Sequence, residues 1–334
     1  MSHKSRHHPE QPAEREQGLD MKVAVVAHTG KSLGGGLNEL RTVLCDRGIK
    51  DPMWSEVPKS RKAPERVREA IDRGARLVLV WGGDGMVQQC VTELAGTDVA
   101  MGILPAGTAN LLAANLGIPQ NIPEAVEIAL NGVRTALDVG TMNGECFAVM
   151  GGAGFDGAMI NDVDGAAKER LGRLAYVRSS LKAMYGPRPS AKITIDGQPW
   201  FEGPASCVLV GNVGTVIGGL KVFEIASPTD GRLDVGVINA EGALQWLRVL
   251  GRVVGRGDVD RSRLVQSTQA KKIDVEFSEK LRYEVDGGAR TKTRRLKIRI
   301  KPKSLIVCTP REKPATPGSL DEQTIDVEKL KVLV

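Results

Sequence analysis

Residues 81–86, WGGDGM, combine the features that a phosphate site needs. They directly follow the apolar run RLVLV, and Gly82, Gly83 and Gly85 surround a single acid, Asp84. Glycines between a strand and a helix leave backbone N–H groups open, and the N-terminus of a helix favours an anion. Neither a GKS or GKT sequence nor the GxGxxG spacing is present here, which excludes a Walker loop and a dinucleotide fingerprint. The stretch therefore indicates a phosphate site; the alternative is a tight turn capped by Asp84.

A second polar turn follows the next apolar strand. The sequence LPAGTANLLAANLGIP, residues 104–119, contains Gly107, Thr108 and Asn110, which combine an open backbone with a hydroxyl and an amide. The carboxyl ends of neighbouring parallel strands meet at one edge of a sheet, so we expect the two turns to lie side by side.

Histidine and cysteine usage excludes several kinds of chemistry. Three of the four histidines lie near the N-terminus, which leaves His28 as the only imidazole within the expected fold. A multi-histidine zinc site cannot be assembled from one histidine, and a catalytic triad would have to use His28. The five cysteines are scattered without a CxxC pair, which predicts reduced, mostly buried thiols. Carboxylates and the backbone must therefore carry the chemistry.

The elements that position these residues follow two patterns. Strands alternate with helices over residues 21 to 130, which predicts a parallel sheet with its ligand at the carboxyl ends of the strands. Short alternating segments with hairpin turns follow from 138 to 308 and predict an antiparallel domain with helical interruptions near 166–184 and 242–257. We expect a disordered tail over 1–20, an α/β domain over 21–137, a β domain over 138–310, and a linker and tail over 311–334.

Charge and hydropathy limit the kinds of partner that we expect the protein to bind. The net charge is +6, and in RTKTRRLKIRIKPK, residues 290–303, cationic residues alternate with Leu296, Ile298 and Ile300. This pattern fits an ordinary solvated strand face or a surface that attracts anionic lipid. Aromatic residues are only 4% of the chain, so we expect no nucleic-acid partner. No apolar run approaches the roughly 20 residues of a membrane span, and the first 20 residues contain no apolar signal core, so we expect a cytoplasmic protein.

Five motifs occur in an order that resembles a known family. They are GGDGM, LPAGTANLLAANLGIP, GGAGFDGAMI (151–160), SPTDGRLDVGVI (227–238) and YEVDGG (283–288). This series is similar to that of the bacterial diacylglycerol kinase and lipid kinase family, which is related to sphingosine kinases, and it covers roughly residues 21 to 310. The GGDG element alone is shared with phosphofructokinases and NAD kinases.

The resemblance implies a fold, two cofactors and a set of site residues. It implies a phosphofructokinase- or NAD kinase-like α/β nucleotide-binding domain, a β-sandwich second domain and an active site in the cleft between them. ATP phosphates would be wrapped by a continuous stretch and contacted by Thr108, with Gly107 and Asn110 beside it. That stretch comprises Gly82, Gly83, Asp84, Gly85, Met86, Val87 and Gln88. Asp230, with carbonyl groups near Ser227 and Arg232, matches the family's Mg²⁺ loop, since Mg²⁺ prefers oxygen ligands; the alternative is a hairpin turn that Asp230 caps. Lys31, at the first strand end, is a candidate point charge for a phosphate.

Three positions depart from the family pattern. Met86 stands where threonine is usual, Leu111 where an aspartate is usual, and Gly288 where the family's DGE motif has a glutamate commonly assigned as proton acceptor. Asp84 is our first candidate for the missing acid, positioning the substrate hydroxyl or the metal. Asp286 is the second candidate, with a buried turn cap as its alternative role.

The leading hypothesis is a lipid kinase of lipid metabolism that transfers the γ-phosphate of ATP to a hydroxyl of diacylglycerol or a related lipid. It would act with Mg²⁺ at an anionic membrane surface, peripheral at the inner face. Phe155 and Asp156, within the GGAGFDGAMI motif, are expected to line its cleft. The alternatives are a catalytically silent member that binds nucleotide or lipid, suggested by Gly288, and a soluble kinase of the NAD kinase type. The acyl chains, the headgroup, the pathway and the oligomeric state are left open by the sequence.

Overall fold

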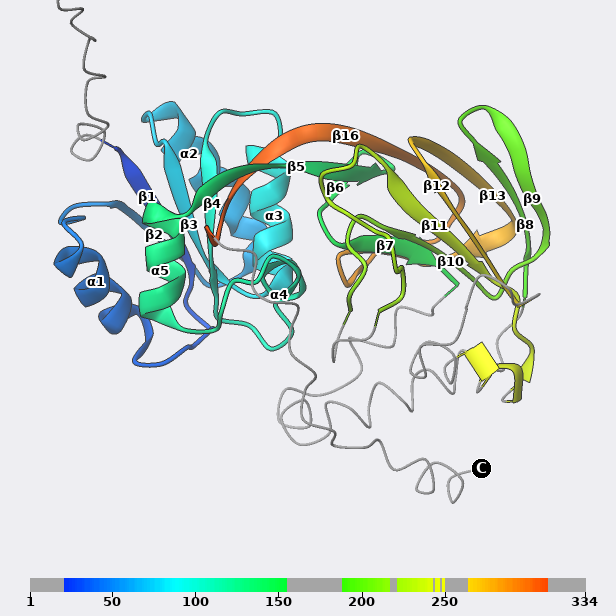
Figure 1. Cartoon of the computed structure of the whole chain (residues 1–334), viewed down its shortest axis with the longest axis horizontal. Helices are drawn as coiled ribbons and strands as arrows, with labels where there is room; N and C mark the ends of the chain where they lie inside the picture. Colours follow the sequence, from blue (N-terminus) through cyan, green and yellow to red (C-terminus); the bar gives the residue numbers. More distant parts are fainter. Residues whose placement is uncertain are drawn as a thin grey trace, which may run out of the picture.

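The computed structural model describes residues 21–154, 188–216, 221–242, 244–246, 248–249 and 264–311. These residues form two lobes side by side. Two long strands, β5 (Val133–Met142) and β16 (Thr293–Thr309), pass from one lobe to the other (Figure 1).

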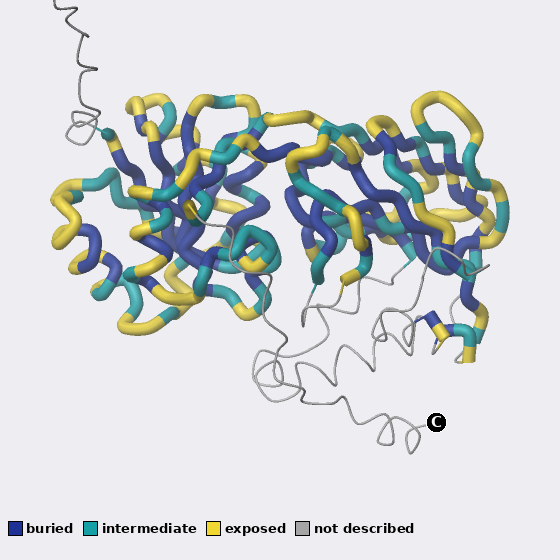
Figure 2. Tube along the Cα trace, in the orientation of Figure 1, coloured by how far each residue is buried: buried dark blue, intermediate teal, exposed yellow. Residues whose placement is uncertain are grey.

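The first lobe is built on four parallel strands in the order β2-β1-β3-β4. Their bounds are β1 Val23–His28, β2 Met53–Val57, β3 Leu77–Gly82 and β4 Ala100–Pro105. Every residue of β3 and β4 is buried, as continuous apolar runs in the centre of a parallel sheet require. Figure 2 shows this buried centre between exposed outer turns. The predicted parallel sheet is confirmed.

The helices of the first lobe pack in two groups. The elements α1 (Gly36–Asp46) and α5 (Ile122–Asn131) contact each other, and η1 (Ser60–Lys62), α2 (Ala63–Asp72) and α3 (Asp84–Leu94) contact one another. The short α4 (Leu111–Asn115) follows β4. The helix α3 starts at Asp84, directly after β3, because the extended backbone of Gly83 serves as its N-cap.

The second lobe contains two sheets that pack face to face. One is a six-stranded sheet in the order β12-β11-β10-β7-β14-β15, and the other is the far half of a 10-stranded sheet, where β16, β13, β8 and β9 follow β4. Their remaining bounds are β6 Glu145–Phe147, β7 Met150–Ala153, β8 Ser190–Ile195, β9 Gln198–Pro204, β10 Cys207–Gly211, β11 Leu233–Ile238, β12 Val265–Ala270, β13 Lys272–Leu281, β14 Tyr283–Val285 and β15 Gly288–Ala289. A core that includes Phe147, Val208 and Ile273 lies between the sheets. The predicted antiparallel β domain is therefore confirmed as a sandwich.

The strand β16 belongs to both lobes. Its Leu296 and Ile298 lie in the sandwich core, whereas Leu305 and Val307 lie in the core of the first lobe. Val307 pairs with Met101 of β4 in parallel, although β16 runs antiparallel to β5 and β13. The predicted boundary between residues 137 and 138 falls inside the continuous strand β5.

Several expectations concern residues outside those described. These are the tail over 1–20, the segment 312–334, the cleft residues Phe155 and Asp156, the helical interruption near 166–184 and most of the one near 242–257. The predicted alternation in β16 is confirmed, because Leu296 and Ile298 are buried and Lys297 is exposed.

Candidate functional site

Two glycine turns meet at the carboxyl ends of β3 and β4. The backbones of Gly83 and Gly107 approach so closely that a Cβ atom on Gly83 would lie 3.1 Å from the Cα of Gly107. A Cβ on Gly107 would lie 2.7 Å from Oδ1 of Asn110 and would also collide with the Gly83 backbone. Only glycine fits at this contact, so the two predicted turns do lie side by side.

Asp84 joins the two turns through hydrogen bonds. Its carboxylate accepts the backbone N–H of Asn110 at 3.0 Å and that of Leu111 at 2.5 Å. Burial raises the pKa of Asp84, while these two hydrogen bonds and the charge of Lys31 oppose the rise. The side chain therefore holds the second turn against the start of α3.

Asn110 closes the second turn. It adopts a left-handed backbone with φ of 48°, which asparagine tolerates better than most residues. Its side chain accepts the Gly107 N–H at 2.9 Å and donates to the Gly107 carbonyl at 2.8 Å. Thr108 is left exposed at the tip of this turn.

Some backbone N–H groups at the two turns are open to a ligand. Within the described residues, the N–H groups of Thr108 and Ala109 have no hydrogen-bond partner. Those of Asp84 and Gly85 belong to the first turn of α3, where no carbonyl of the helix can reach them. A cluster of free amides without side chains in front of them suits a phosphate.

Lys31 adds a positive charge near Asp84, and this charge opposes the rise in the pKa of that carboxyl group. It follows β1, and Trp81 Nε1 of β3 donates to its carbonyl at 3.3 Å. The strands β1 and β3 are neighbours at the point where the strand order reverses, which is where open α/β sheets bind ligands. Lys31 also lowers the pKa of His28, although burial of that imidazole lowers it more.

The remaining residues of the predicted phosphate stretch face inward. Met86 and Val87 are buried in the core of the first lobe, and Gly82 lies against the Met86 side chain. Gln88 is also buried and donates from Nε2 to the carbonyl of Cys146 in β6 at 2.9 Å. Through Gln88, α3 is connected to the second lobe.

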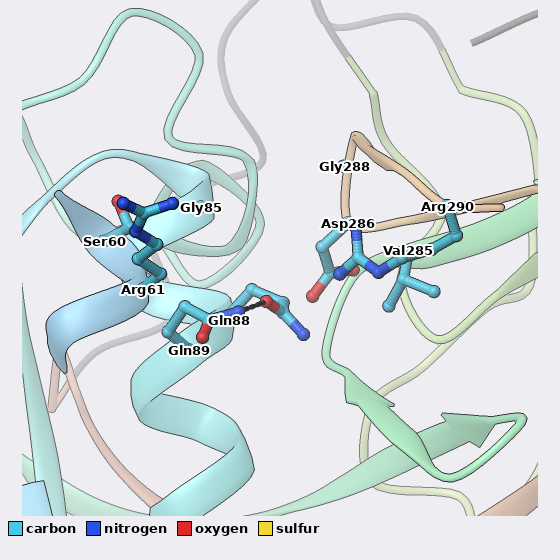
Figure 3. Close-up of a pocket in the computed structure, with 9 residues that line it drawn as sticks. All are labelled: Ser60, Arg61, Gly85, Gln88, Gln89, Val285, Asp286, Gly288 and Arg290. Atoms are coloured by element: carbon cyan, nitrogen blue, oxygen red, sulfur yellow. Dashed lines mark hydrogen bonds between the residues drawn. The ribbon is translucent and has the colours of Figure 1, made fainter. Parts of the chain in front are cut away.

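A pocket of about 160 Å³ opens between the lobes (Figure 3). Gly85, Gln88 and Gln89 of α3 line one side, and Asp286 and Gly288 line the other. The full lining is Ser60, Arg61, Gly85, Gln88, Gln89, Val285, Asp286, Gly288 and Arg290. The structure thus brings the GGDG turn and the DGG turn to opposite walls of one pocket.

Asp286 is held by the backbone between β6 and β7. Its carboxylate accepts the N–H groups of Ala148 at 2.9 Å, Val149 at 3.0 Å and Met150 at 2.9 Å. Burial raises the pKa of Asp286 to about 6; the three hydrogen bonds oppose the rise, and the negative charge of Asp84 adds to it. Asp84 is therefore close enough to influence the ionisation of Asp286.

The predicted metal loop lies away from this pocket. The turn 227–232 precedes β11, and Oδ1 of Asp230 accepts the Arg232 N–H at 2.9 Å. Gln269 Nε2 lies 3.3 Å from carboxylate oxygens of both Asp230 and Asp234. Asp138 of β5 accepts the Gly231 N–H at 2.6 Å, which fixes the loop to the strand shared by both lobes. Asp230 is exposed, and its carboxylate with the nearby carbonyls forms an all-oxygen donor set that fits Mg²⁺.

Sequence reasoning did not assign three residues of potential importance. Neither Arg61 nor Arg290 was assigned a role from the sequence, yet both line the pocket. Glu284, within YEVDGG, is half-buried, and burial raises its pKa; among the residues that the structure describes, its Oε1 has no hydrogen-bond partner. No local pattern distinguishes these side chains, since their surroundings come from segments far away in the chain.

The fold defines a two-lobed protein, an α/β lobe joined to a β-sandwich, with its two glycine turns at the carboxyl ends of parallel strands. Residues 29–142 match the model of the diacylglycerol kinase catalytic domain, and residues 150–309 match that of the YegS C-terminal NAD kinase beta sandwich-like domain. A diacylglycerol kinase of Bacillus subtilis (strain 168) is 31% identical over 229 residues, which are 67% of this chain and 75% of that protein. The chain therefore belongs to the diacylglycerol kinase and lipid kinase family, a family of kinases, and this membership implies the use of ATP.

Two solved structures support the fold. A diacylglycerol kinase from Bacillus anthracis str. Sterne has a TM-score of 0.69 at 24% identity, covering 86% of this chain and 96% of its own. An NAD kinase from Archaeoglobus fulgidus in complex with ATP has a TM-score of 0.50 at 11% identity, covering 88% of this chain and 95% of its own. The predicted family and the predicted fold class are confirmed.

The described part of the chain contains no helix that could span a membrane. None of the helices within it has both the length and the apolar content that crossing a bilayer takes.

Proposed function

We propose that the protein is an ATP-dependent lipid kinase that transfers the γ-phosphate of ATP to a hydroxyl of diacylglycerol or a related lipid. The observation that carries the proposal is the pairing of the two glycine turns by Asp84, opposite Asp286 across one pocket. Membership of the diacylglycerol kinase family supports the same reaction.

In this proposal the first lobe holds the phosphates of ATP. The free N–H groups of Gly85, Thr108 and Ala109 bind phosphate oxygens, and Lys31 neutralises part of their charge. Asp84 is a positioning residue, because its carboxylate holds the N–H groups of Asn110 and Leu111 and, unlike that of Asp286, is not part of the pocket lining. Phosphoryl transfer depends mainly on such positioning and on charge neutralisation.

Asp286 is the proposed proton acceptor at the other wall of the pocket. The acceptor oxygen forms a bond to the γ-phosphorus, the bond from that phosphorus to the bridging oxygen breaks, and ADP leaves. The hydroxyl proton passes to the Asp286 carboxylate, which with a pKa of about 6 is ionised at neutral pH. General base assistance is worth about 10²- to 10⁴-fold, so one carboxylate could replace the usual glutamate of the family in part.

Mg²⁺ is the second proposed cofactor, with Asp230 and the carbonyl groups of Ser227 and Arg232 as its protein ligands. When bound, the ion supplies positive charge and fixes the conformation of the loop that carries it. Asp138 holds this loop to β5 through the Gly231 N–H, so the ion would strengthen the link between loop and strand.

We further propose that the exposed cations of β16 hold the protein at the inner face of an anionic membrane. Lys297, Lys301 and Lys303 are exposed, whereas Arg295 and Arg299 form ion pairs with Glu276 and Asp274. Cosedimentation with vesicles containing phosphatidylserine is expected for the wild type, and the binding constant should fall about 100-fold when all three lysines become glutamine, at about 1 kcal/mol for each charge. Equal binding of this variant, or equal binding to neutral vesicles, would contradict the membrane role.

The kinase activity is tested with γ-labelled Mg-ATP and a total lipid extract. We expect label in the organic phase from the wild type and at least 100-fold less from Asp84→Asn, because the amide turns one acceptor oxygen into a donor facing an N–H group. Asp98→Asn, at an exposed acid outside the pocket, is the matched control and should retain activity. Circular dichroism and ATP binding separate loss of catalysis from loss of the fold.

The same experiment decides between this function and its alternatives. ATP binding without labelled lipid in the wild type would favour a silent binding member, which the glycine at position 288 suggests. Conversion of added NAD to NADP would favour a soluble kinase of the NAD kinase type.

A further inference from the structure

The pocket between the lobes is lined by more cationic side chains than the binding of an uncharged acceptor requires. Of the 9 residues that line it, Arg61 and Arg290 are cationic and Asp286 is the only acid. A neutral lipid hydroxyl requires an acid or a polar acceptor, whereas two guanidinium groups are suited to phosphate oxygens.

Arg290 occupies the space where an acidic side chain at position 288 would begin. A Cβ atom built on Gly288 would lie 2.5 Å from Nη1 of Arg290. Figure 3 shows the Arg290 side chain lying beside Asp286 at the same wall. The loss of the family's glutamate at this position is therefore accompanied by a guanidinium group in its place.

Two contacts hold Arg290 in place and leave part of its guanidinium group available to a ligand. Its Nε donates to Glu145 Oε2 at 2.7 Å, and Nη1 lies 3.3 Å from its neighbour's carbonyl. Within the described residues Nη2 has no partner, so one face of the guanidinium group is free to bind a ligand. An arginine fixed by a glutamate through one nitrogen is preorganised for a second anion.

Arg61 provides the second cation from the other lobe. It lies in η1 next to Ser60, and no carboxylate of the described residues pairs with it. Figure 3 shows its side chain on the side of Gly85, the residue that begins the proposed phosphate site. The two arginines therefore approach the pocket from opposite lobes.

We propose that the acceptor carries a phosphate group close to its reacting hydroxyl, and that Arg290 and Arg61 bind this group. The inference rests on the proposed kinase function and specifies its substrate as an acidic, phosphate-bearing lipid in place of neutral diacylglycerol. The pocket of about 160 Å³ is small, so a phosphate and a hydroxyl that occupy it together would be near each other in the acceptor.

The reaction is unchanged by this choice of acceptor. The hydroxyl oxygen bonds to the γ-phosphorus of ATP, the bond to the bridging oxygen breaks, and the proton is released with ADP as the other product. The arginines bind a phosphate that is already present on the acceptor.

The test divides a bacterial lipid extract into neutral and acidic fractions on an anion exchanger before the assay. Each fraction is incubated with γ-labelled Mg-ATP, and soluble sn-glycerol 3-phosphate and glycerol form a further matched pair. We expect the label in the acidic fraction. Arg290→Gln and Arg61→Gln should each lower this labelling about 10- to 100-fold, the value of one hydrogen bond to a charged group, and should leave labelling of neutral lipid unchanged.

Two variants complete the design. Arg295→Gln is the matched control, because Arg295 also pairs with a glutamate but lies outside the pocket. Gly288→Glu introduces an acid beside Arg290 at a backbone position that any residue can adopt, and should decrease labelling of acidic lipid while sparing neutral lipid.

The outcomes separate this inference from the function on which it rests. Label confined to neutral lipid would overturn the inference and leave the lipid kinase intact. An equal loss of both activities in Arg290→Gln would also overturn it, since the arginine would then serve the transferred phosphoryl group. Label in glycerol 3-phosphate alone would support the phosphate-binding site and overturn the inference that the acceptor is a lipid. No label in any acceptor would overturn both the kinase function and the inference.

Discussion

At the residue scale, Asp84 and Asp286 differ in what surrounds them. Asp84 accepts two N–H groups from the turn after β4, within its own lobe. Asp286 accepts three N–H groups from residues 148–150, at least 136 positions away in the chain. The first side chain joins two local turns, and the second anchors the pocket wall of the other lobe.

The raised pKa of Asp286 predicts a specific dependence of stability on pH. In the folded chain the pKa of Asp286 is about 6, whereas its ordinary value is 3.8. The protonated carboxyl group therefore adds to the free energy of unfolding in full below pH 3.8, and this contribution is lost as the pH rises through 6. Relative to Asp286→Asn, the wild type should lose up to about 3 kcal/mol of unfolding free energy between pH 4 and 7. Urea unfolding of both proteins measures this difference. A difference that does not change with pH would contradict the raised pKa.

At the element scale, the important feature is the contact between the turns after β3 and β4. Parallel strands bring these turns to one edge, but only the absence of side chains at Gly83 and Gly107 lets the backbones touch. This contact brings the free backbone N–H groups of the two turns close together.

A methyl group at position 107 should therefore separate the turns. Gly107→Ala is expected to lower the unfolding free energy by about 1–3 kcal/mol, as overpacking of a close contact does, and to weaken ATP binding. Gly85→Ala is the control for stability, because the nearest atom to its Cβ would be Ser60 Oγ at 4.0 Å. Thermal unfolding of the two variants compares them, and equal stability would mean that the contact is not tight.

At the scale of the whole molecule, β16 makes the two lobes one structure. It extends the parallel sheet beyond β4, pairs with β5 along its length and continues into the sandwich beside β13. Gln88 adds a second connection from α3 to β6. Neither lobe retains a complete core without this strand.

The shared strand predicts that both lobes unfold together. Cys90 in α3 and Cys207 in β10 are buried in different lobes, and their thiols should become reactive at the same urea concentration. The exposed Cys45 should react in the native protein and serves as the internal control. Pulse alkylation followed by mass spectrometry gives the midpoint for each thiol. Two separate midpoints would show that the lobes unfold independently.

The sequence alone determined the order of the elements, the position of GGDG and GTAN at the ends of strands, and the family. These features are local, since apolar periodicity and turn residues act over a few neighbouring positions. The alternation in β16 predicted its buried face, but not that Leu305 and Val307 would enter the core of the first lobe.

Only the tertiary structure decided which side chains face the pocket. Gln88 was expected at a phosphate; it lines the pocket and its amide also reaches Cys146, because α3 packs against β6. Asp286 receives its three N–H groups, and Arg290 reaches Glu145, from segments more than 130 residues away. Such contacts follow from the packing of the two lobes around β16, and the identities of neighbouring residues in the chain do not contain them.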